Sequence, residues 1–217
     1  MDLKFWLDKW ERNDLGFHAN EFEPILTKYF AEIHPGTVFV PLCGKSRDLL
    51  WFIQKGWRVL GVEASPIACR AFFDENGLSS RMETRGDFTL YIGDSVTLWC
   101  GDFFSMPSEP FKDVTAVYDR AALIALPADL RPKYVERLIR LLSASDFKRL
   151  PLLLIALEYP QDRASGPPFS VDSSEVRRLY GPWRSVQELL REEDTVLPRV
   201  NAKFHDVRIF ETAYLVD

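Results

Sequence analysis

Charged side chains stand at the ends of several apolar runs, where the strands of an α/β protein present residues to a ligand. Glu63 ends the run "RVLGVE" and lies 21 positions after Leu42. An acidic residue at this place in a dinucleotide-type fold accepts hydrogen bonds from the hydroxyl groups of a ribose. In the alternative interpretation, Glu63 is an exposed carboxylate that helps to cap the next helix near Ser65. Glu63 is therefore a candidate for a nucleoside site.

The segment "WCGDFF" offers a second set of groups suited to a nucleoside. An adenine ring needs an acceptor for its exocyclic amine and apolar groups against its faces. Asp102 supplies the first, and Phe103 and Phe104 supply the second. In the alternative interpretation, Asp102 caps the next turn and the two phenylalanines belong to the core.

Asp119 and Arg120 end the buried run "VTAVYDR" and form the most unusual charged pair in the chain. Burying two charges is costly unless they pair or face a ligand. One interpretation is a structural ion pair at a strand end. The other is a catalytic pair, in which Arg120 faces the ligand and Asp119 removes a proton or orients Arg120; we favour the orienting role.

The turn in "VFVPLCGKSRDLLWF" lacks the features of a phosphate-binding loop. A phosphate loop of the GxxxxGK[ST] type needs a glycine where Phe39 stands, and a dinucleotide fingerprint needs three spaced glycines where only Gly44 is present. These absences disfavour a phosphate-loop nucleotidase. The expected ligand has adenine and ribose but needs no pyrophosphate cradle, as in S-adenosylmethionine, whose amino-acid tail can meet the backbone of a turn.

Alternating strands and helices must position these residues. Apolar spacing predicts two N-terminal helices, around residues 5–10 and 22–33. We predict strands at 37–42, 58–64, 114–120 and 150–159, helices at 46–56, 65–77 and 128–143, and a hairpin at 88–104 that turns at Gly93 and Asp94. The tail is predicted as a helix at 172–181, a strand or helix at 183–193 and a closing strand at 205–216.

Repeated strand–helix units predict an α/β fold with a mostly parallel sheet, helices on both faces and an antiparallel C-terminal edge. In such a sheet, ligands bind outside the carboxyl ends of the strands. The 217 residues contain no repeat or linker, so we expect one domain spanning residues 1–217.

The composition of the chain limits the partners and the cellular location that we expect for the protein. The net charge is -5 and no basic cluster is present, so we expect no nucleic-acid partner. The longest apolar run, residues 150–157, is too short for a membrane span, and the charged N-terminus lacks the apolar centre of a signal peptide. Three scattered cysteines and three scattered histidines predict no metal site and a reducing, cytoplasmic location. We expect a monomer, because no apolar face is left over.

Six ordered segments together resemble the thiopurine S-methyltransferase family across almost the whole chain. They are "FWLDKWERNDLGFH" (5–18), "FVPLCGKSRDLLWF" (39–52), "GVEAS" (61–65), "LWCGDFF" (98–104), "VYDRAALIALP" (117–127) and "GPPFSV" (166–171). The resemblance implies a three-layer, Rossmann-like methyltransferase fold with a seven-stranded sheet and S-adenosyl-L-methionine as the cofactor. It also implies that residues 1–35 fold over the site as a lid, and the polar loop within this segment predicts that the lid moves.

The resemblance also assigns residues. The cofactor-contacting positions of the family match Trp10, Leu42, Glu63 and Arg120, and its adenine-side segment matches Gly101, Asp102 and Phe103. Phe17 matches a position that faces the acceptor, and Arg120 is placed near both the cofactor and the acceptor. Trp10 is suited to a cation–π contact with a sulfonium, or it packs as an ordinary helix aromatic.

The implied reaction is methyl transfer from S-adenosylmethionine to the sulfur of a small aromatic or heterocyclic thiol. One departure leaves the acceptor open: Pro160 stands where bacterial members often carry an aspartate. Methylation of an inorganic or small chalcogen, or of a halide, is therefore an alternative. A cofactor-binding protein without catalysis is a second alternative, disfavoured by the intact "DR" and lid sequences.

Overall fold

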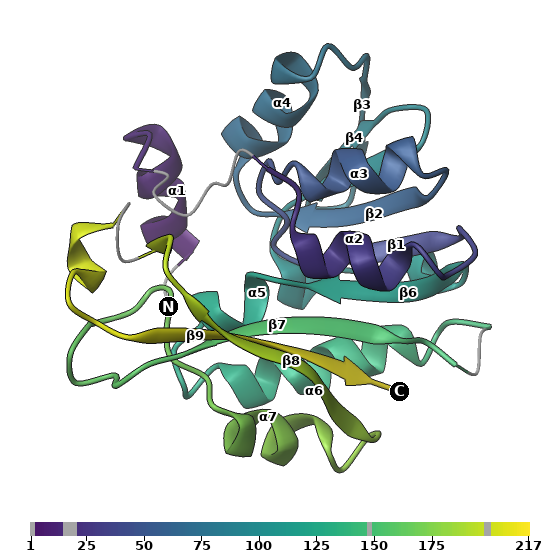
Figure 1. Ribbon diagram of the computed structural model, residues 1–217. Coiled ribbons are helices and arrows are strands. Elements are labelled where there is room, and N and C mark those ends of the chain that lie inside the picture. Colours follow the sequence, from purple (N-terminus) through teal and green to yellow (C-terminus); the bar gives the residue numbers. More distant parts are fainter. Residues whose placement is uncertain (1–2, 15–20, 147–148, 198–200) are drawn as a thin grey trace.

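A computed structural model describes residues 3–14, 21–146, 149–197 and 201–217. Within these ranges, nine strands form one sheet in the order β3-β4-β5-β2-β1-β6-β7-β9-β8 (Figure 1). The strands are β1 (Thr37–Val40), β2 (Arg58–Glu63), β3 (Arg81–Arg85), β4 (Phe88–Ile92), β5 (Val96–Cys100), β6 (Val114–Asp119), β7 (Leu152–Glu158), β8 (Val186–Asp194) and β9 (Ile209–Val216).

The centre of the sheet is parallel and both edges are antiparallel. Strands β5, β2, β1, β6 and β7 pair in parallel, β9 pairs antiparallel with β7 and β8, and β3 and β4 form an antiparallel edge beyond β5. This arrangement confirms the predicted fold class. The predicted count of seven strands is too low, because β3 and β4 extend the sheet beyond β5.

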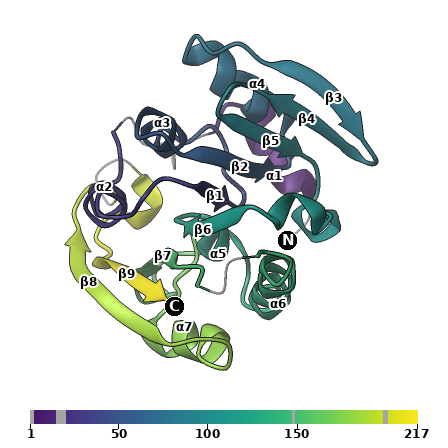
Figure 2. The same cartoon turned by 90° about the vertical axis from the view of Figure 1, so that its right-hand side faces the viewer.

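Helices cover both faces of the sheet. They are α1 (Leu3–Glu11), α2 (Pro24–Phe30), α3 (Asp48–Gln54), α4 (Pro66–Glu75), α5 (Ala122–Ala125), α6 (Arg131–Leu142) and α7 (Ser173–Tyr180). Viewed along the sheet, α2, α3 and α4 lie on one side, and α5, α6 and α7 lie on the other (Figure 2). Each group of helices packs on the sheet through its own apolar cluster. The sheet is therefore the middle of three layers, which explains why β7 is apolar on both faces.

Local signals in the sequence account for the boundaries of α4 and of the β4–β5 hairpin. The Ser65 hydroxyl accepts a hydrogen bond from the Ala68 N–H at 3.3 Å, and Pro66 occupies the first turn of α4. Gly77 follows the helix with a φ of +63°, a conformation that glycine adopts without strain. The hairpin turns at Gly93, whose N–H donates to the Val96 carbonyl at 2.8 Å. These features confirm the predicted cap and turn.

The parallel pairing brings the carboxyl ends of β1, β2, β5 and β6 to one edge of the sheet. Because β9 runs antiparallel to β7, its amino end reaches the same edge, where Glu211 lies beside Leu157. The strand order reverses at β1, between β2 and β6, which is where ligands bind in open α/β sheets. No helix in the described part of the chain is long and apolar enough to cross a membrane.

Candidate active site

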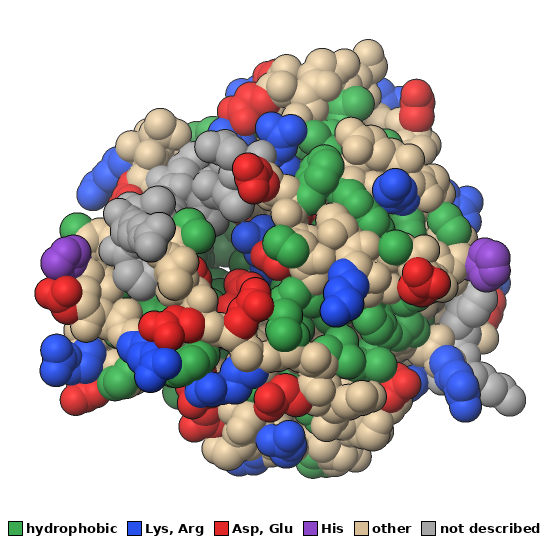
Figure 3. Space-filling model, viewed as in Figure 1, with side chains coloured by type: hydrophobic (Ala, Val, Ile, Leu, Met, Phe, Trp, Pro, Cys, Tyr) green, Lys and Arg blue, Asp and Glu red, His purple; other side chains and the backbone are tan. Residues whose placement is uncertain are grey.

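A cavity of about 650 Å³ opens at the carboxyl edge of the sheet. Its walls come from the turn after β1, the ends of β2, β5 and β6, the helix α1 and the start of β9. In the space-filling view, acidic and basic side chains gather around a hollow on this face (Figure 3). A volume of this size lies within the range of cofactor and ligand pockets, about 300–1,000 Å³.

The turn after β1 brings its backbone to the cavity through two left-handed residues. Leu42 has a φ of 45° and Gly44 a φ of 55°, and both residues line the cavity. A Cβ atom at position 44 would lie 3.3 Å from the ring of Trp10, so the glycine allows the indole to approach closely. The Gly44 N–H donates to the Glu63 Oε2 atom at 2.9 Å. The single glycine of this turn thus connects α1, β1 and β2 at the cavity.

Glu63 is a buried carboxylate in the cavity wall. Its Oε1 atom accepts a hydrogen bond from the Ser65 N–H at 2.8 Å, and Oε2 accepts from Gly44. Burial raises the pKa of Glu63, and the backbone N–H groups oppose this effect. Each carboxylate oxygen has two acceptor sites, so the group retains capacity for two hydroxyl donors. The alternative interpretation is wrong about the exposure of this carboxylate, whereas its contact with Ser65 at the start of α4 is confirmed.

In the segment after β5, Asp102 caps a short turn and also lines the cavity together with Phe103. Asp102 accepts hydrogen bonds from the Phe104 N–H at 3.0 Å and from the Ser105 hydroxyl at 3.4 Å, so it caps the short 3₁₀ turn Phe103–Ser105. Asp102 and Phe103 line the cavity, whereas Gly101 does not. A Cβ atom at Gly101 would collide with the Phe88 ring at 2.5 Å. Gly101 therefore permits the packing that places its neighbours.

Arg120 is held by carboxylates from two other elements. Its Nη1 atom lies 3.0 Å from Asp48 Oδ2, and its Nε atom lies 3.5 Å from Glu23 Oε2. The Tyr118 hydroxyl donates to the same Asp48 oxygen at 2.9 Å. Burial lowers the pKa of Arg120, but Tyr118, Asp48, Glu23 and Glu211 together raise it above its ordinary value. The guanidinium is therefore a permanent cation in the cavity wall.

Asp119 faces away from Arg120, which corrects the predicted orienting contact. Asp119 is fully buried and accepts hydrogen bonds from the Tyr134 hydroxyl at 2.6 Å and from the Ala122 and Leu123 N–H groups. Successive side chains of a strand point to opposite faces, so neighbours at the end of β6 cannot share partners. Burial raises the pKa of Asp119 to about 6. Asp119 positions Tyr134 and α5 and does not line the cavity.

We expect Asp119→Ala to destabilise the fold. The change leaves the Tyr134 hydroxyl and two backbone N–H groups without an acceptor, and each buried unsatisfied group costs about 1–3 kcal/mol. The free energy of unfolding should fall by about 3 kcal/mol, measured by urea denaturation. Asp119→Asn keeps one acceptor oxygen and should lose less than half as much. Equal losses in the two variants would contradict this structural role.

Helix α1 forms one side of the cavity. Leu3, Trp6, Lys9 and Trp10 line it, and Trp10 is buried. The burial of Trp10 and its packing on Gly44 fit both the cofactor role and the packing role predicted for this residue. Phe17, predicted to face the acceptor, lies outside the described residues, as does most of the loop predicted to move.

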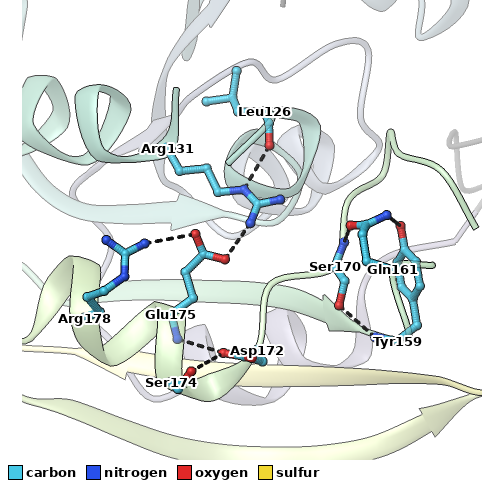
Figure 4. A network of polar contacts seen from close by, with 9 residues as sticks. All are labelled: Leu126, Arg131, Tyr159, Gln161, Ser170, Asp172, Ser174, Glu175 and Arg178. Carbon is cyan, nitrogen blue, oxygen red and sulfur yellow. Dashed lines mark hydrogen bonds and ion pairs between the residues drawn. The ribbon is translucent and has the colours of Figure 1, made fainter. Parts of the chain in front are cut away.

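Part of the cavity wall is apolar, and Arg131 holds one segment of it in place. The lining residues of this part include Ile124, Leu126 and Leu157. The buried Arg131 side chain donates from Nε to the Leu126 carbonyl at 2.9 Å and from Nη1 to Glu175 at 2.6 Å (Figure 4). These two bonds connect the segment before α6 to α7.

A second part of the same network holds the segment after β7. Gln161 accepts from the Ser170 N–H at 2.8 Å and donates to the Tyr159 hydroxyl at 3.2 Å (Figure 4). The Tyr159 hydroxyl donates to the Pro168 carbonyl at 2.6 Å, and Pro168 lines the cavity. The segment that contains Pro160 is therefore held by side-chain hydrogen bonds at both of its ends.

Sequence patterns did not identify three carboxylates near Arg120: Glu23, Asp48 and Glu211. Asp48 is almost fully buried within the first turn of α3, and Glu23 is a buried N-cap of α2. Glu211 interrupts the apolar run "RIFETAYLV", a signal that could have identified it. Across the described ranges, no group of three or more His, Cys, Asp or Glu side chains is arranged to hold a metal ion.

Comparisons with known proteins agree with this geometry. The sequence pattern of thiopurine S-methyltransferase matches residues 1–216. A thiopurine S-methyltransferase of Nitrosospira multiformis is 43% identical over 194 residues, covering 88% of this chain and 86% of that protein. A thiopurine S-methyltransferase of Pseudomonas fluorescens strain Pf0-1 is 44% identical over 200 residues, covering 90% and 89%.

A solved structure shares the fold at low sequence identity. It is a Burkholderia thailandensis 1,6-didemethyltoxoflavin-N1-methyltransferase with bound 1,6-didemethyltoxoflavin and S-adenosylhomocysteine. Its TM-score is 0.64 at 13% identity, covering 99% of this chain and 86% of that chain. This likeness supports the architecture of the sheet and its helices.

Proposed function

This chain belongs to the thiopurine S-methyltransferase family, and we propose that it methylates the sulfur of a small aromatic or heterocyclic thiol in the cavity described above. It is an S-adenosylmethionine-dependent enzyme, as its family is. The observation that carries the proposal is that residues suited to the cofactor and an apolar wall suited to a ring line one cavity.

The residues present fit the cofactor. Glu63 would accept hydrogen bonds from the ribose hydroxyls, and Asp102 with Phe103 would hold the adenine. The backbone around Leu42 would meet the amino-acid tail, and Trp10 would place its ring against the sulfonium. The acceptor capacity of Glu63 and the place of all five residues in the cavity wall support these assignments.

When bound, S-adenosylmethionine supplies an electrophilic methyl group on a sulfonium sulfur. The principal task of the protein is then to align an acceptor sulfur with that methyl group in a site without water. Such alignment can reduce a barrier by about 7–11 kcal/mol. The apolar wall with Ile124 and Leu126 would hold the acceptor ring, and the Arg120 guanidinium would stabilise the thiolate directly or through water.

An acceptor panel tests the proposed substrate class. We expect kcat/KM for benzenethiol to exceed that for iodide and hydrogen selenide by at least about tenfold, because burial of an aromatic ring contributes about 1.5–3 kcal/mol. Formation of S-adenosylhomocysteine would be measured for each acceptor at the same pH. A higher value for selenide or iodide would instead assign the site to small chalcogens or halides.

The non-catalytic alternative gives a different result in the same panel. A pure binding protein would bind S-adenosylhomocysteine and yield no methylated product from any acceptor. The retention of Arg120 in the cavity wall favours the enzyme, because a cation beside an apolar wall suits a thiolate.

We further propose a monomeric, cytoplasmic enzyme of one domain, with residues 1–35 as its lid. The three cysteines, Cys43, Cys69 and Cys100, are buried and unpaired in disulfides, as expected in a reducing compartment. The position of α1 along the cavity supports the lid. Size-exclusion chromatography and cell fractionation would test the monomer and the compartment.

A further inference from the structure

We propose that Glu211 is the base that accepts the proton of the acceptor thiol, so that the enzyme also methylates thiols that are largely protonated at neutral pH. This inference rests on the proposed function and extends it beyond acidic aromatic thiols. In the step, the S–H bond breaks and its proton moves to a Glu211 oxygen. The thiolate electron pair then forms the bond to the methyl carbon, while the pair of the broken methyl–sulfonium bond stays on the cofactor sulfur.

Glu211 stands apart from the other carboxylates of the cavity. Five of the six carboxylates that line it in the described ranges have a hydrogen-bond or ion-pair partner on at least one oxygen: Asp14, Asp48, Glu63, Asp102 and Asp194. The side chain of Glu211 has neither a hydrogen bond nor an ion pair to any described residue, although its backbone is paired with β7 and β8. A carboxylate that lies on the cavity wall without such a partner among the described residues can accept a substrate proton.

The position of Glu211 suits contact with the acceptor. In the register of the sheet it lies directly beside Leu157, which belongs to the apolar wall proposed for the acceptor ring. Arg120 is near enough to act electrostatically on Glu211. The cavity therefore places a fixed cation and an unpartnered carboxylate beside the same apolar wall, which suits generation and stabilisation of a thiolate.

The groups around Glu211 raise its pKa to a value near neutral pH. Burial raises its pKa from the ordinary value of 4.5 to about 7, with repulsion from Glu23 adding to this effect and Arg120 opposing it. Asp194 and Glu192 of the neighbouring strand β8 raise it further. A general base is most effective when its pKa lies near the working pH.

Two acceptors of different acidity test this role at pH 7. 4-Nitrobenzenethiol is ionised and needs no base, whereas phenylmethanethiol is largely protonated, like a cysteine thiol with its pKa of about 8.5. General bases contribute about 10²–10⁴-fold, so we expect Glu211→Gln to lower kcat/KM for phenylmethanethiol by about 100-fold. The kcat/KM for 4-nitrobenzenethiol should change less than about twofold, which is small beside the 10²–10⁴-fold that a general base contributes.

Glu188→Gln is the matched control, because Glu188 also lies on the neighbouring strand β8, is exposed, does not line the cavity and is not among the groups that raise the pKa of Glu211. It should leave both rates unchanged. Equal losses for both acceptors in Glu211→Gln, or no loss for either, would overturn the role of Glu211. Failure of the wild-type protein to methylate 4-nitrobenzenethiol would instead overturn the proposed function.

Thermal unfolding provides a readout that does not depend on activity. Because the pKa of Glu211 is raised in the folded state, folding favours its protonated form, and stability falls as the pH rises from 4.5 to about 7. Glu211→Gln removes this loss. The variant should melt close to the wild-type temperature at pH 5 and above it at pH 8. A difference independent of pH would show that Glu211 does not titrate in this window and would overturn the proposal.

Discussion

Arg120→Ala is expected to lower kcat/KM for an aromatic thiol by about 100-fold, in line with the loss of a single charged or hydrogen-bonding group at a reacting atom. The guanidinium is the cation that Asp48 and Glu23 hold in the cavity wall. Its removal leaves a developing thiolate among carboxylates with no compensating charge. Steady-state kinetics with benzenethiol would measure the effect.

Asp119→Asn is the comparison for this change, since it alters the adjacent residue on the opposite face of the strand. It should lower turnover much less than Arg120→Ala. Circular dichroism and thermal unfolding would confirm that both variants fold, because Asp48 keeps its bonds to Tyr118 and Glu23 without Arg120. Wild-type turnover in Arg120→Ala would refute the assignment of Arg120.

Glu63→Ala is expected to weaken the binding of S-adenosylhomocysteine at least tenfold, or by about 1.4 kcal/mol. The carboxylate is the group proposed to accept hydrogen bonds from both ribose hydroxyls. It also holds the turn at Gly44 and the start of α4 through Ser65. Isothermal titration calorimetry would measure the dissociation constant.

Two further variants separate the ribose contact from a general structural effect. Glu63→Gln keeps the size and one acceptor oxygen, so it should bind the ligand more tightly than Glu63→Ala. Glu83→Ala removes a partly exposed carboxylate on β3, which pairs with Arg81 and Arg85 and does not line the cavity, so this variant should bind like the wild type. Wild-type affinity in both Glu63 variants would place the ribose elsewhere.

Most of the fold could be predicted because its strands are apolar and its turns carry recognisable residues. Ser65, Pro66 and Gly77 mark α4, and Gly93 marks the hairpin. Strand β3 was missed because "RMETR" is polar and largely exposed, and only its pairing with β4 makes it a strand. The segment of β8 was ambiguous for the same reason: its charged residues are exposed, and β9 determines its conformation.

Site residues could be predicted when they directly follow a strand of the sheet. Residues that reach the site from a distant segment could not be predicted. Glu63, Asp102 and Arg120 follow strands, so the parallel sheet brings them to one edge. Asp48 is 70 residues from Tyr118 and 72 from Arg120, and no local pattern reveals such pairs. Strand alternation alone separates Asp119 from Arg120, so the sequence already argues against a contact between the two side chains.

A crystal structure with S-adenosylhomocysteine and an aromatic thiol is the most direct test that one cavity holds both ligands. The account predicts the ribose hydroxyls within hydrogen-bond distance of Glu63, about 2.5–3.0 Å, and the adenine beside Asp102 and Phe103. The thiol ring should lie against Leu126 and Leu157, with its sulfur facing Arg120 and Glu211. Density for the adenosine away from Glu63, or for the thiol outside this cavity, would contradict the account.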